Sequence, residues 1–298
     1  MSSHGGQKRH TPGAANLEPL SRRLLQAAGV LSLLLVLVVV NSLLHGGDKS
    51  PFNPNPVAAA AEQVRSSPGA RFTTYLEFSS PSLPGTVSAS GSGAINGETG
   101  RLRVELAMNS SFTGPLHMVM ISDGEYDYTS GTVVENKLPP GKEWVRSQAG
   151  SSGDGNATID IDDPLRMLSA AGAVEMVGRE PVDGRTTRHF RAEIQVSDFI
   201  DFLREEGKPG VAESYERIEE QAPGGITAEA WVDEADLLRR FRVVMPMPGK
   251  TDGPTVTVSL RMDLFDYGSR PDIRLPDPAS VVDGSLDSDE APTSATFS

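Results

Sequence analysis

The sequence predicts an α+β domain in which a curved antiparallel sheet is covered by short α-helices, preceded by one N-terminal transmembrane helix. Three observations carry this prediction. Apolar and polar residues alternate along several segments between 71 and 264, turn-forming residues separate these segments, and an uncharged apolar run occupies 24–44. Strict alternation is typical of a strand with one dry and one wet face, and such sheets are usually antiparallel.

The apolar run from Leu24 to Leu44 contains 21 residues and no charge. A helix rises about 1.5 Å per residue, so this run spans roughly 31 Å, about the hydrocarbon thickness of a bilayer. A cleaved signal peptide has a shorter apolar core, and the nearest small-residue cleavage site, at Ala58–Ala61, lies far downstream. We therefore expect an uncleaved signal-anchor, with secretion after cleavage as the alternative.

The charges around this run predict its orientation. Four basic residues and one acidic residue precede it, which places residues 1–23, expected to be a disordered tail, in the cytoplasm. The C-terminal domain is then extracytoplasmic and the chain is a single-pass protein of the cell membrane. Of the net charge of −13, the first 47 residues contribute +3, which leaves −16 for the remainder. Such acidity excludes nucleic acid as an expected partner.

The chain contains no cysteine. This excludes disulfides, thiolate catalysis and a lipidated cysteine. Composition further divides the chain into a linker with three prolines at 45–56, one domain at 57–283 and a disordered acidic tail at 284–298.

Alternation is clearest in four segments, each with one apolar register. These segments are 71–78, 101–108, 189–196 and 255–264. Turn signals such as "INGETG" and "PVDGR" separate the strands. Helices are expected at 57–67, at 162–172, from Ser197 as the N-cap, and at 211–221.

Residues that could perform catalysis do not form a recognisable motif. His117 and His189 fall in predicted strands opposite the apolar register, and we expect both to be exposed. Trp231 is expected to be a packing residue. The acidic stretch 154–163 lacks the glycine and glutamate of a calcium loop. The sequence therefore predicts no enzyme, no cofactor and no metal.

Four segments, in order, resemble a known family. They are "DGEYDYTSGTVVENKLPPGKEWVR", "VEMVGREPVDGRTTRHFRAEI", "AEAWVDEADLLRRFRV" and "LRMDLFDYGSRPDIRLPDPASVVD". They resemble the LolA-like fold, and especially its LppX/LprG branch of exported lipid-binding lipoproteins. The resemblance implies a half-open antiparallel barrel of ten or eleven strands, closed by helices over a hydrophobic cavity. The chain departs from the family in lacking the lipidated cysteine, whose role the anchor would take.

The resemblance implies an extracytoplasmic protein that binds or transfers lipids or acyl chains in the cell envelope. Apolar residues on the predicted inner registers would then line the cavity. These candidates are Phe72, Leu76, Phe78, Leu102, Val104, Leu106, Met108, Met118, Met120, Leu165, Leu168, Phe190, Ile194, Phe199, Phe202, Val258, Leu260 and Met262. The expected partners are the membrane and a lipid or acylated ligand. In the alternative, the same fold is a protein-interaction or sensor module without lipid cargo, and its partner is an envelope membrane protein.

Overall fold

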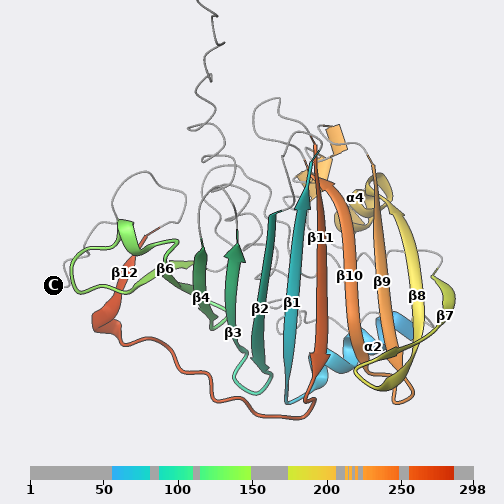
Figure 1. Cartoon of the computed structure of the whole chain (residues 1–298), viewed down its shortest axis with the longest axis horizontal. Helices are drawn as coiled ribbons and strands as arrows, with labels where there is room; N and C mark the ends of the chain where they lie inside the picture. Colours follow the sequence, from blue (N-terminus) through green and yellow to red (C-terminus); the bar gives the residue numbers. More distant parts are fainter. Residues whose placement is uncertain are drawn as a thin grey trace, which may run out of the picture.

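A single sheet of twelve strands dominates the part of the chain that the computed structural model describes, namely residues 56–80, 87–109, 115–148, 174–205, 212–213, 215–216, 219–220, 224–247 and 255–284. The strand order is β12-β6-β5-β4-β3-β2-β1-β11-β10-β9-β8-β7 (Figure 1). The described fold is mostly β, with few short helices. The predicted curved antiparallel sheet with short helices is confirmed, although twelve strands replace the expected ten or eleven.

The strands and helices have the following bounds. The strands are β1 Gly69–Ser79, β2 Val87–Asn96, β3 Arg101–Asn109, β4 Leu116–Ser122, β5 Tyr126–Gly131, β6 Trp144–Gln148, β7 Glu175–Val182, β8 Arg185–Gln195, β9 Gly225–Asp233, β10 Leu238–Met247, β11 Val256–Phe265 and β12 Val281–Asp283. The helices are α2 Pro56–Ser66 and α4 Val196–Glu205, with 3₁₀ turns η1 Glu135–Lys137 and η2 Pro278–Ser280.

The first strand lies in the middle of the sheet, because β1 pairs with β2 on one side and with β11 on the other. Neighbouring strands are antiparallel except at one edge, where β12 pairs with β6 in parallel. The segment after β11 runs past the ends of several strands before it adds β12 at this edge (Figure 1). This last strand, which is only three residues long, was not among the predicted strands.

Burial follows the predicted alternation. Along β1, Phe72, Leu76 and Phe78 are buried, whereas Arg71, Thr73 and Tyr75 are exposed. The buried registers of neighbouring strands meet on one face, which we call the inner face; the opposite face is the outer face. Because the side-chain period of a strand is two, this register is fixed by the apolar pattern alone.

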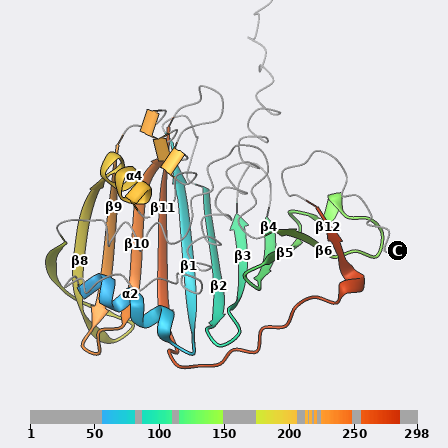
Figure 2. The same cartoon turned by 180° about the vertical axis from the view of Figure 1, so that it is seen from behind.

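Helices α2 and α4 lie on the inner face (Figure 2). The described residues 212–213, 215–216 and 219–220, which fall in the helix predicted at 211–221, are also helical. Helix α2 contacts β9 and β10, and α4 contacts β8. In α4, the buried Phe199, Ile200 and Leu203 recur at helical spacing and face the sheet. The helices predicted at 57–67 and from Ser197 are thus confirmed, although α4 already begins at Val196, so Ser197 lies inside the helix and is not its N-cap. The helix predicted at 162–172 lies outside the described residues, as does the predicted anchor at 24–44.

A two-residue hairpin joins β7 to β8. Asp183 and Gly184 both have positive φ angles, of 47° and 76°, and Val182 pairs directly with Arg185. Two left-handed residues define a type I′ turn, whose twist matches that of the strands, and Asp-Gly is a preferred sequence for it. The predicted turn in "PVDGR" is therefore present.

Candidate functional site

The inner face carries the predicted lining residues. Sixteen of the eighteen are described. Fifteen of these are buried in one apolar cluster, and the sixteenth, Phe202, is partly buried and packs against it. They are Phe72, Leu76, Phe78, Leu102, Val104, Leu106, Met108, Met118, Met120, Phe190, Ile194, Phe199, Phe202, Val258, Leu260 and Met262. Leu165 and Leu168 lie outside the described residues. That these residues contact a ligand stays a prediction.

On the inner face, β2 carries smaller side chains than its neighbouring strands. Ala89, Gly91 and Gly93 are its inner residues opposite Met108, Leu106 and Val104 of β3. A Cβ atom on Gly93 would lie 2.2 Å from Cζ of Phe72, and one on Gly91 would lie 2.5 Å from Cδ2 of Leu106. Larger side chains from the two neighbouring strands therefore lean over the glycines and form the surface there.

Helices α2 and α4 cover the inner face unevenly. Figure 2 shows α2 and α4 over β8 to β11 and β1, whereas neither of these two helices extends over β3 or β4. The inner side chains of β3 and β4 include Met108, Met118 and Met120. Methionine is unbranched and polarisable, so a wall that contains several can adapt to differently shaped apolar neighbours.

The inner face becomes polar at its β4–β5 end. Ser122 pairs with Asp127, and Leu102 is the apolar neighbour of Ser122 in the same row. Ser122 is fully buried and Thr129 nearly so. One carboxylate oxygen of Asp127, Oδ1, is buried and makes no hydrogen bond. Burial raises the pKa of Asp127, a hydrogen bond with Ser122 opposes the rise, and the nearby charge of Asp123 adds to it.

Asp127→Asn is expected to stabilise the protein at pH 7 by about 1 kcal/mol, because an ionised, incompletely hydrogen-bonded carboxylate is costly to bury. A carboxyl whose folded pKa is raised destabilises the fold when ionised. The gain of the variant should therefore shrink as the pH falls through the folded pKa, and it should vanish near the ordinary value of 3.8. Urea unfolding from pH 7 to pH 4 measures this, with the exposed Asp272→Asn as control. A variant less stable than the wild type at pH 7 would contradict the prediction.

The outer face carries a network centred on Glu229, whose side chain is only 4% exposed. Arg191 Nη2 donates to its Oε1 at 2.7 Å, and Arg242 Nη1 donates to its Oε2 at 3.0 Å. Burial alone would raise the pKa of Glu229, but the hydrogen bonds from both arginines outweigh it and lower the pKa below its ordinary value. The carboxylate is thus held in its charged form.

His189 is the neighbour of this network, and its expected exposure is wrong. Its residue exposure is 8%, because its ring stacks on Trp231 with 4.1 Å between ring centroids. Nδ1 lies 3.0 Å from Oε1 of Glu180, and Trp231 Nε1 donates to Oε2 of the same carboxylate at 3.1 Å. These hydrogen bonds, from Trp231 first and His189 second, lower the pKa of Glu180. Trp231 is a packing residue as predicted, whereas His117 on β4 is exposed as predicted.

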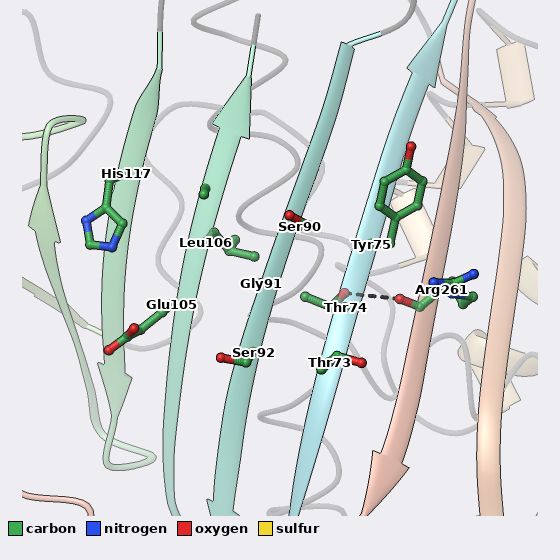
Figure 3. A pocket seen from close by; sticks show the side chains of 11 residues that line it. Thr73, Thr74, Tyr75, Ser90, Gly91, Ser92, Glu105, Leu106, His117 and Arg261 are labelled. Atoms are coloured by element: carbon green, nitrogen blue, oxygen red, sulfur yellow. Dashed lines mark hydrogen bonds between the residues drawn. The ribbon is translucent and has the colours of Figure 1, made fainter. Parts of the chain in front are cut away.

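A second feature of the outer face, which the sequence did not indicate, is an open groove of about 510 Å³ across β1 to β4 and β11 (Figure 3). We call it the outer groove. The lining residues on the outer register are Thr73, Tyr75, Ser90, Ser92, Glu105, Ala107, His117 and Arg261, and three residues of the inner register, Thr74, Gly91 and Leu106, also border the groove. In the sequence, serines alternate on the outer register of β2. They predict a groove only when the side chains on the neighbouring strands are also known.

The described residues contain no group of three or more histidine, aspartate or glutamate side chains arranged to hold a metal ion. No helix within the same ranges has the length and apolar character needed to cross a bilayer.

Comparison with known proteins gives similarity at the level of structure. No protein-family model and no curated protein matches the sequence. The chain is structurally similar to the lipoproteins LppX and LprF and to a lipoprotein-sorting domain, the kind of protein that the four motifs resemble.

Three solved structures illustrate this similarity. The Mycobacterium tuberculosis lipoprotein LppX is 12% identical with a TM-score of 0.42, and the match covers 75% of this chain and 100% of that one. LprF from Mycobacterium bovis is 14% identical with a TM-score of 0.37, covering 77% and 99%. An outer membrane lipoprotein-sorting protein domain from Vibrio parahaemolyticus is 9% identical with a TM-score of 0.24, covering 71% and 90%.

Proposed function

We propose that this protein binds acyl chains of lipids on its inner face, outside the cytoplasm, and that the segment 24–44 anchors it to the membrane. The observation that supports this most directly is the continuous apolar inner face, of which α2 and α4 lie over one half (Figure 2). An acyl chain along β2 to β4 would contact Leu106, Met108 and Met118. The binding would select for shape and apolarity more than for charge.

The energy of such binding is sufficient. Burying one methylene group gains about 0.8 kcal/mol, so ten methylenes gain roughly 8 kcal/mol before the costs of association. Micromolar affinity corresponds to about 8 kcal/mol, and longer or paired chains would leave a surplus. The polar end of the inner face, at Ser122 and Asp127, offers hydrogen-bonding groups to the head of the lipid.

The proposal is tested by extracting the full chain, purified from its native host, with organic solvent and analysing the extract for lipid by mass spectrometry. A second measurement titrates the emptied protein with dansyl-undecanoic acid and follows dansyl fluorescence. We expect a bound lipid and a Kd in the micromolar range.

A pair of variants on β4 places the site. Met118 points to the inner face, and Val119 points to the outer face. Met118→Trp should weaken dansyl-undecanoic acid binding at least about tenfold by filling space over the inner face, whereas Val119→Trp should leave it unchanged. Circular dichroism and thermal unfolding establish that both variants fold, because overpacking alone costs about 1–3 kcal/mol. An empty extract together with no fluorescence change would refute acyl-chain binding.

The alternative function is a tethered protein-interaction module, and the packing of α4 favours it. Phe199 is fully buried and packs edge-on against Tyr215, with 4.9 Å between ring centroids, and Phe202 lies beside it. Aromatic side chains of this kind could occupy the space that a ligand needs. Crosslinking in native membranes distinguishes the two functions, since one stoichiometric protein partner and no bound lipid would support the module.

A further inference from the structure

The outer groove is hollow because small side chains form its floor and larger ones flank it. Across the strands, Tyr75 pairs with Ser90, Ser90 pairs with Ala107, and Ala107 pairs with His117. The adjacent row runs from Thr73 through Ser92 to Glu105. Neighbouring strands lie about 4.8 Å apart, so the tyrosine and histidine that flank the floor are about three strand spacings apart.

Tyr75 forms one wall and is held in a defined position (Figure 3). It is 36% exposed, one of few large apolar or aromatic side chains exposed in the described ranges. Its hydroxyl donates to Oε2 of Glu77 at 3.3 Å, and the guanidinium carbon of Arg261 lies 5.8 Å from its ring centroid. Because both contacts restrain the ring, it can present an apolar surface to the groove without a large loss of side-chain freedom.

The remaining lining carries several polar groups, and its one acid and one arginine balance in charge. Serine and threonine hydroxyls both donate and accept hydrogen bonds, Glu105 accepts, and Arg261 donates. Arg103 contacts Oε1 of Glu105 and fixes this carboxylate beside the groove. One acid and one arginine disfavour a strongly charged ligand, and a single arginine on so acidic a chain cannot compete for nucleic acid. The floor also lacks the continuous apolar surface that an acyl chain requires.

These features together match one ligand class. We propose that the outer groove binds a short run of pyranose rings, with the apolar face of one ring packed on Tyr75 and the sugar hydroxyls hydrogen-bonded by the floor and by Glu105 and Arg261. The volume of about 510 Å³ lies within the usual range of small-ligand sites, about 300–1,000 Å³. The groove lies on the opposite face of the sheet from the proposed acyl-chain site. A result that refutes one of the two proposals therefore does not refute the other.

The test uses the full chain in a polyoxyethylene detergent, which carries no sugar that could compete. Cellohexaose, chitohexaose, mannohexaose and laminarihexaose are titrated separately by calorimetry, and a second arm uses phosphatidylcholine vesicles that contain digalactosyl diacylglycerol. Binding of a soluble hexasaccharide identifies a free polysaccharide as the ligand, and binding of the vesicles alone identifies a glycolipid head. We expect one of these probes to bind.

Three variants and one control variant locate the binding. Tyr75→Ala should weaken it about tenfold, whereas Tyr75→Phe, which keeps the ring, should remain within about twofold of the wild type. Ser90→Trp, which fills the floor, should abolish it. Arg71→Ala alters an exposed residue on the same face of β1 and should have no effect. The proposal is overturned if no probe binds, or if a probe binds Tyr75→Ala and Ser90→Trp as tightly as the wild type. Dansyl-undecanoic acid binding should be unchanged in all four variants.

Discussion

Glu229→Ala is expected to lower the free energy of unfolding by about 3 kcal/mol. The buried carboxylate receives hydrogen bonds from Arg191 and Arg242, and its Oε1 lies 3.4 Å from Nε2 of His189. Removing it leaves two guanidinium groups without their shared acceptor, and breaking a buried ion pair from one side typically costs about 3–5 kcal/mol. Both arginines retain access to water, which places the expectation at the lower end of that range. Urea unfolding followed by circular dichroism measures the loss.

The matched control is Glu98→Ala. Glu98 pairs with Arg270 at 2.7 Å, but both side chains are more than half exposed, so the loss should stay below about 1 kcal/mol. Similar losses for the two variants would show that the network around Glu229 is no stronger than a surface pair. The pH dependence gives a second readout. Because the folded pKa of Glu229 is lowered, its stabilisation is complete above the ordinary value of 4.5 and is lost as the pH falls through the folded pKa. Part of the acid sensitivity of the wild type should therefore be absent from Glu229→Ala.

Gly91→Ala is expected to destabilise the protein by about 3 kcal/mol, although it adds a single methyl group. The added Cβ would lie 2.1 Å from the carbonyl oxygen of Glu105 on the neighbouring strand and 2.5 Å from a methyl carbon of Leu106. A side-chain clash can be relieved by a rotamer change, but a main-chain clash between paired strands forces β2 and β3 apart. Thermal unfolding of the purified variant measures the effect.

Gly225→Ala is the matched control, because Gly225 also lies in a strand of the same sheet. There the nearest atom to an added Cβ, the carbonyl oxygen of Ile194, is at 3.6 Å, an ordinary contact. This substitution should change the stability by less than about 1 kcal/mol, because the reduced freedom of the unfolded chain offsets part of any cost. If Gly91→Ala and Gly225→Ala lowered the stability equally, the backbones of β2 and β3 would not approach each other as closely at Gly91 as the structure indicates.

Much of the fold could be predicted because its determinants are local. The alternation in β1, β3, β8 and β11 needs only a short window of sequence, and the turn at Asp183 and Gly184 needs only two residues. The short helices α2 and α4 follow from local composition and spacing in the same way. The three-residue β12 has too few residues to show a period, so its existence depends on the exposed edge of β6 rather than on its own sequence.

The sites were harder to predict because they depend on cross-strand neighbours. His189 lies on the wet register, and its burial follows from Trp231 opposite it on β9 and from Glu180 across the hairpin. The outer groove likewise requires Ser90 to lie between Tyr75 and Ala107. A register on a single strand predicts which face a side chain occupies, but not how large its neighbours on the next strands are.

The central position of β1 also bears on the folding kinetics. Thr74 on β1 donates its hydroxyl hydrogen to the carbonyl oxygen of Arg261 on β11, 187 residues later in the chain. The central pair of β1 and β11 thus closes across most of the polypeptide, and domains dominated by such distant pairings generally fold in milliseconds to seconds. A nascent chain that ends before β11 would expose the unpaired edge of β1, so we expect late truncations to aggregate rather than to accumulate as folded fragments.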